Sequence, residues 1–128
     1  MAKELRFYDL NASNTSQTIK FTFNRPVTNL AIQIVDVDQS NSYDDEVVVN
    51  TAGWTATLGG SVKGLGTSQN PYQSSTGASV ADGSGLADIT VRYAAATEFS
   101  ITYRQGNGTI TGNPHIGIRS MSFTPSSC

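Results

Sequence analysis

The chain has 128 residues, which suits one domain with its own buried core. Its net charge is −2, and its eight lysine and arginine residues are spread singly, which excludes the basic patch that nucleic acid or an anionic membrane would need. No apolar run approaches the ~20 residues that a membrane-spanning helix requires, so we expect no membrane insertion.

The first part of the chain predicts three strands. Residues 5–10 form a short strand, and residues 18–23 alternate apolar and polar side chains as a half-buried strand does. Pro26 cannot donate to a ladder and is expected to end that strand. Residues 27–38 form the longest strand, and a period of two then places Asp36 and Asp38 on the face that carries its apolar residues.

The middle of the chain predicts shorter elements. Residues 46–51 and 54–58 read as strands, and Trp54 alternates with apolar neighbours, which favours a core position. Residues 59–85 are dense in Gly, Ser and Thr, and a loop of this length is usually functional or disordered. Within it we expect short strands near residues 61–63 and 79–81.

The last part predicts strands at residues 86–93, 98–104 and 115–123. The first two are either hairpin neighbours or cross between sheets. In the third, the apolar residues change face part-way, which indicates a β-bulge near Arg119 and Ser120. About eight strands and no helical periodicity predict an all-β, antiparallel sandwich of jelly-roll type.

The two ends suggest a piece of a larger protein. Cys128 is the last residue and the sole cysteine, so it forms no disulfide within the chain. Residues 125–128 look like the start of a linker or a cut end, whereas residues 1–124 form a single domain. We therefore expect one module of a larger chain.

Residues 36–46 hold five of the ten acidic residues. Such crowding favours a hard cation, and calcium takes the oxygen ligands that this segment offers. The spacing follows part of the EF-hand loop, but its glycine and its final glutamate are missing, and strands flank the segment. We predict a calcium site at the edge of the sandwich, and the alternative is a solvated acidic hairpin tip. The candidate ligands are Asp36, Asp38, Asp44 and Asp45.

Catalytic residues are not evident. His115 is the sole histidine, Cys128 lies at the terminus, and no G-x-S-x-G motif is present. One histidine and one distant cysteine also cannot build a zinc site. We therefore predict a non-enzymatic protein with no catalytic residues.

A binding function would use aromatic and polar side chains near the surface. Tyr43 and Tyr72 lie in predicted loops, and Arg92 and Arg104 lie on predicted strands. These four residues are the candidates for contact with a ligand.

Three segments resemble a module of bacterial cell-surface proteins of adhesin type. Residues 23–38 and 45–49 are similar to its pattern "F-x-x-P-V-x-x-L-x-F-x-I-x-D-I-D", followed by a polar loop and "D-x-V-x-V". Residues 112–123 are similar to its ending "G-N-x-x-I-G-I-S-D-I-S-F", except that Arg119 and Ser120 replace a position that is often acidic. The resemblance implies a β-sandwich located outside the cell, at its surface.

These observations lead to one functional hypothesis and two alternatives. We expect a calcium-stabilised adhesin module that recognises a glycan or a protein, on a host or neighbouring cell, through loops at the rim of the sandwich. The alternatives are a carbohydrate-binding module of a secreted hydrolase and a structural stalk domain with no ligand.

Overall fold

The computed structural model describes residues 5–7, 15–81, 83–106, 110–111 and 114–126. In this part of the chain the regular structure consists of nine strands in one sheet, without a helix. Every strand pair is antiparallel, which confirms the all-β, antiparallel prediction. The strands are β1 (Leu5–Phe7), β2 (Ser16–Val35), β3 (Gln39–Ser40), β4 (Tyr43–Val49), β5 (Thr55–Leu58), β6 (Val62–Lys63), β7 (Tyr72–Ser74), β8 (Ile89–Gln105) and β9 (Ile116–Thr124).

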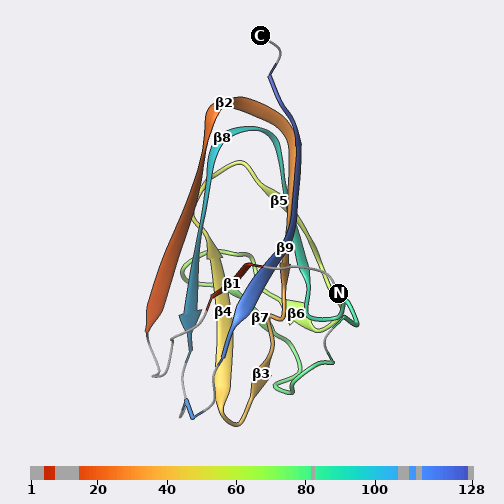
Figure 1. Ribbon diagram of the computed structural model, residues 1–128. Coiled ribbons are helices and arrows are strands. Elements are labelled where there is room, and N and C mark those ends of the chain that lie inside the picture. The colour runs from red at the N-terminus through yellow and green to blue at the C-terminus, as the bar shows by residue number, and fades with distance from the viewer. Residues whose placement is uncertain (1–4, 8–14, 82, 107–109, 112–113, 127–128) are drawn as a thin grey trace.

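Two long strands organise the sheet. β2 and β8 pair along most of their length and bend over together at one end of the molecule (Figure 1). Their pairing stops at Thr22 opposite Glu98 and resumes at Val27 opposite Ala96. The bend lies at this interruption, and it curls the sheet so that each long strand belongs to both halves.

The predicted break at Pro26 is wrong, because β2 continues through it. Pro26 lies inside the interrupted stretch, where the pairing with β8 has lapsed. Its missing N–H therefore costs no hydrogen bond of that ladder. The predicted strand to Asp38 is also wrong, since β2 ends at Val35.

β8 likewise replaces two predicted strands by one. Residues 94–97, which were expected to connect two strands, form the bend of β8. The chain therefore crosses from one half of the sheet to the other, as in the second of the two alternatives, and does not form a hairpin. The rings of Tyr93 and Phe99, on either side of the bend, meet edge to face at 5.9 Å.

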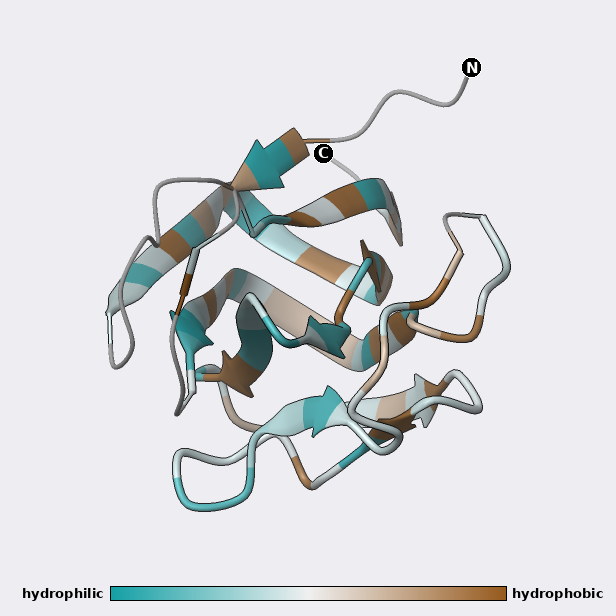
Figure 2. Cartoon of the chain, turned by 90° about the horizontal axis from the view of Figure 1, so that it is seen from below, coloured by the Kyte–Doolittle hydropathy of each residue, from teal (hydrophilic) through white to brown (hydrophobic). Residues whose placement is uncertain are grey.

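The two halves enclose one core. One half has the order β1–β9–β2–β8–β5, and the other has the order β2–β8–β4–β7–β6. Apolar and polar residues alternate along the strands (Figure 2), and one buried cluster draws on both halves. This arrangement is compatible with a sandwich, and the jelly-roll connectivity stays a prediction. Fully buried members of the core include Leu30, Ile32, Ile34, Val47, Ile89, Val91, Phe99 and Ile101.

The predicted bulge in β9 is confirmed. Gln33 pairs with Ser120, whereas the next residue, Ile34, pairs with Ile118, so Arg119 is the extra residue. Without this insertion a period of two would place Ile118 and Met121 on opposite faces. With it, Met121 lies opposite Ile32 and packs against the core.

The long Gly- and Ser-rich region is partly ordered as strand. β6 confirms the short strand expected near residues 61–63, but residues 79–81 are not in a strand. Tyr72 begins β7, is 4% exposed, and accepts a hydrogen bond from the indole N–H of Trp54 at 3.0 Å. Trp54 packs against the core as predicted, although β5 starts one residue later. Of the first predicted strand, residues 8–10 lie outside the described residues.

Candidate functional site

The acidic rim, residues 36–46, lies at the end of the molecule opposite the bend (Figure 1). Asp36 follows β2 with a φ of 70°, a left-handed conformation that is uncommon for aspartate. This residue interrupts the alternation that β2 would have continued. Val37 is consequently fully buried, and its N–H donates to the carbonyl of Ala87 at 3.0 Å.

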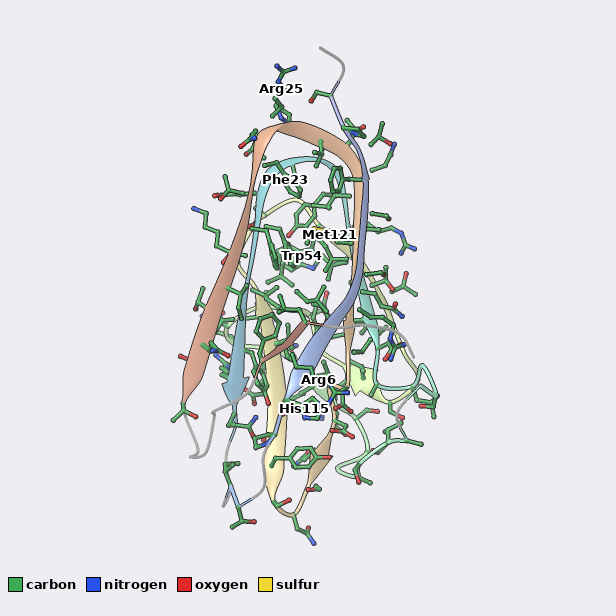
Figure 3. The ribbon with its side chains drawn as sticks, in the orientation of Figure 1. Arg6, Phe23, Arg25, Trp54, His115 and Met121 are labelled. Atoms are coloured by element: carbon green, nitrogen blue, oxygen red, sulfur yellow. The ribbon has the colours of Figure 1, made fainter. Side chains whose placement is uncertain are left out.

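The side chain of Asp36 faces β9. Its Oδ2 lies 3.0 Å from Nε2 of His115, and both side chains are mostly buried. His115 lies in the half of the molecule that carries the acidic rim (Figure 3). An ion pair forms here when the imidazole is protonated, and this contact ties the end of β2 to the start of β9.

Asp45 forms the centre of the rim. It is 1% exposed, and its Oδ1 accepts hydrogen bonds from the hydroxyl of Tyr103 at 2.7 Å and from Nε2 of Gln105 at 2.9 Å. Burial raises the pKa of Asp45 to about 8, against the lowering effect of these two donors. A mostly protonated carboxyl at neutral pH is a weaker cation ligand than a carboxylate, because metal binding must expel the proton.

Asp38 binds the opposite loop rather than continuing an apolar row. It is 3% exposed, and its Oδ2 accepts from the backbone N–H of Val80 at 2.9 Å. Its own N–H donates weakly to Oδ2 of Asp45 at 3.4 Å. Burial, the charge of Asp38 and a hydrogen bond with it raise the pKa of Tyr43, so the phenol of Tyr43 stays protonated beside this carboxylate.

The remaining acidic residues lie on the other face of β4. The N–H of Asp44 donates to Oε1 of Gln105 at 2.8 Å, and its buried Oδ1 has no hydrogen-bond partner among the described residues. Burial and the charge of Glu46 raise the pKa of Asp44, and Lys63 opposes this effect. Glu46 forms an ion pair with Arg104, whose Nε lies 2.6 Å from its Oε1.

Three of the four predicted calcium ligands therefore face different protein partners, and Asp44 lies on the other face of β4. Within residues 5–7, 15–81, 83–106, 110–111 and 114–126, no group of three or more His, Cys, Asp or Glu side chains is placed to hold a metal ion. The rim as it stands does not fit a preassembled calcium site, and the calcium ligand set remains a prediction. The protein partners are His115 for Asp36, Val80 for Asp38, and Tyr103 with Gln105 for Asp45.

The four predicted ligand-contact residues are scattered. Tyr72 lies in a strand and in the core, contrary to the expectation of a loop. Tyr43 also lies in a strand rather than in the expected loop, at the start of β4. Arg92 is exposed on β8, with Nη1 3.4 Å from Oγ1 of Thr57. Arg104 is held by Glu46. Among these residues, the structure places Tyr43 and Arg104 toward the acidic end.

The residues that hold Asp45 were not singled out from the sequence. Tyr103 and Gln105 continue the inward row of Phe99 and Ile101 on β8, and all four are buried. A polar residue on an apolar row must find a partner, so Gln105 was a readable signal for a buried polar network.

Comparison of the chain with protein-family models, with curated proteins and with solved structures found no match. In the part of the chain that the structure describes, no helix is long and apolar enough to cross a membrane.

Proposed function

We propose that this domain is a non-enzymatic recognition module of a bacterial surface protein of adhesin type. It would bind a glycan or a protein of a host or neighbouring cell through the loops at the ends of the curled sheet. The observation that carries this proposal is that these loops are pinned to the sheet by buried side-chain hydrogen bonds. At the acidic rim, Asp45 on β4 accepts weakly from the N–H of Asp38 in the loop after β2, and Asp38 in turn accepts from the N–H of Val80 in the loop before β8.

Pinned loops suit recognition for a thermodynamic reason. A loop that is already ordered loses little conformational entropy when it binds, so more of the contact energy appears as affinity. The location outside the cell rests on the resemblance of residues 23–38, 45–49 and 112–123 to surface modules and on the neutral polar composition.

Calcium remains part of the proposal as a stabilising ion. Carboxylate oxygens are the ligands that calcium prefers, and the rim supplies Asp36, Asp38, Asp44 and Asp45. A bound ion would have to share these oxygens with the protein donors that contact them now. The ion would add rigidity to the loop and would take no part in a reaction.

The test is binding of the purified domain to a glycan array and to intact cells, with and without a chelator. We expect binding to at least one glycan or cell-surface protein. An absence of binding to both, with a folded domain, would contradict the recognition function and favour a structural stalk.

A further inference from the structure

A hollow lies at the bend, at the end of the molecule that Arg25 marks (Figure 3). It has a volume of about 360 Å³, at the lower end of the range for small-molecule sites. The loop after β4 and the bend of β8 line it, and it is open to solvent. We call it the bend hollow, and its lining includes Pro26, Thr51, Ala95, Ala96, Thr97 and Glu98.

The walls of the bend hollow are fixed to both halves of the sheet. The carbonyl of Thr51 accepts from the hydroxyl of Tyr93 at 2.8 Å, and its Oγ1 accepts from the N–H of Ser100 at 3.0 Å. Tyr93 and Ser100 lie on opposite sides of the bend in β8. The hollow is therefore formed before any ligand enters, as most small-molecule sites are.

The lining combines a small apolar surface with a few polar groups. Pro26, Ala95 and Ala96 leave room because their side chains are short. Thr97 offers a hydroxyl that can both donate and accept, and Glu98 offers carboxylate oxygens that accept.

The charge in the hollow is already balanced. Nζ of Lys20 lies 2.7 Å from Oε2 of Glu98, and about half of each side chain is exposed. This pair neutralises the carboxylate, while Oε1 can still accept from a ligand. The carboxylate of Glu98 disfavours an anionic ligand, and its existing ion pair with Lys20 leaves little net charge to attract a cationic one, so the charges favour a neutral ligand.

We propose that the bend hollow binds a single neutral sugar residue of a glycan. The C–H face of the sugar would lie on Pro26 and the alanines, and its hydroxyl groups would bond to Thr97 and Glu98. This inference rests on the proposed recognition function and names its ligand class and place. A ligand of about a dozen non-hydrogen atoms without aromatic stacking is expected to bind with a Kd on the order of a millimolar.

The experiment is NMR titration of the isotope-labelled domain with free glucose, galactose and N-acetylglucosamine. We expect one of these sugars to shift the amide signals of Thr51 and residues 95–98 in a saturable manner. Ala95→Arg fills the hollow and should weaken binding at least tenfold. Its matched control is Ala94→Arg, because Ala94 is an exposed neighbour on the same strand that does not line the hollow.

Glu98→Gln supplies a second variant that preserves side-chain size, and it should weaken binding several-fold. Lys20→Met also breaks the ion pair with Glu98 but leaves the carboxylate, so it should retain binding. Unchanged affinity in both Ala95→Arg and Glu98→Gln would overturn the proposal.

The location of the shifts separates this proposal from the recognition function. Saturable shifts confined to the acidic rim would refute the bend hollow and leave glycan recognition standing. No shift with these three sugars would also refute the proposal for the hollow, whereas the array and cell-binding experiment decides the recognition function.

Discussion

Replacement of Asp45 by asparagine should remove much of the pH dependence of stability. The folded-state pKa of about 8 exceeds the value of 3.8 for the free side chain. Between these values the folded protein binds a proton at Asp45 that the unfolded chain releases. The contribution of Asp45 to stability is therefore greatest below the lower pKa and is lost as the pH rises toward the higher one.

The size of this effect follows from the two pKa values of Asp45. Each pH unit between them changes the free energy of unfolding by about 1.4 kcal/mol, so the change from about pH 5 to about pH 7 is about 3 kcal/mol. The asparagine side chain of the variant cannot ionise, and its amide oxygen can still accept from Tyr103 and Gln105. The NH₂ group of asparagine replaces Oδ2 and cannot accept from the N–H of Asp38. This loss lowers the free energy of unfolding by about 1 kcal/mol at every pH.

Urea denaturation of the wild type and of Asp45→Asn at several pH values measures the difference. A chelator in every sample removes any contribution from a bound cation, and the other titrating groups largely cancel between the two proteins. The stability of the variant relative to the wild type should rise by about 3 kcal/mol over that interval. Parallel stability curves for the two proteins would refute the reasoning, because they would mean that Asp45 has the same pKa in the folded and unfolded states.

Three further predictions concern calcium binding at the rim and two contacts near β6 and β7. Millimolar Ca²⁺ should raise the melting temperature of the wild type, because a ligand that binds only the folded state stabilises it. The increase should vanish in Asp36→Ala and in Asp38→Ala. An unchanged melting temperature for the wild type would contradict the calcium proposal. Gly64→Ala should lower the free energy of unfolding by more than about 2 kcal/mol in urea denaturation, because Gly64 has a φ of 112° and an added Cβ would collide with the carbonyl of Pro71. A loss below about 0.5 kcal/mol would argue against this close approach. Tyr72→Phe should cost about 1–3 kcal/mol by the same measurement, because the indole N–H of Trp54 would lose its acceptor, and an unchanged stability would mean that water replaces the hydroxyl.

Alternation along the chain predicted most of the longer strand segments and much of the core. Ile32, Phe99 and Ile101 each lie within a predicted strand, and each is fully buried. The bulge at Arg119 was also readable, because two apolar rows of one strand cannot otherwise share a face. These features could be predicted because they depend on the local alternation of apolar and polar residues, which can be read directly from the sequence.

The continuity of β2 and β8 could not be read in the same way. Pro26 ends a strand when a partner needs its N–H, but here the ladder with β8 is interrupted at that point. Whether a proline breaks a strand thus depends on the pairing of another segment that lies far away in the chain. Local sequence carries no information on that pairing.

The alternation expected for Asp36 and Asp38 is interrupted at a single residue. A period of two placed Asp36 and Asp38 on one apolar row, but the φ of 70° at Asp36 resets the direction of every side chain that follows. Val37 takes the core position, and the carboxylates turn to His115 and to the N–H of Val80. The charge cluster was visible in the sequence, whereas the donors that satisfy it come from distant segments.

The two ends of the curled sheet should respond independently to change. The Asp45 network joins the start of β4 to the end of β8, whereas Ala95 lies at the bend of β8, at the opposite end of the molecule (Figure 1). Substitutions with no shared contacts usually have additive effects on stability. The double variant Asp45→Asn with Ala95→Arg should therefore show the sum of the two single changes in unfolding free energy, within about 0.5 kcal/mol. A larger deviation would mean that β8 transmits strain from the rim to the bend, and the two ends would then have to be treated as one site.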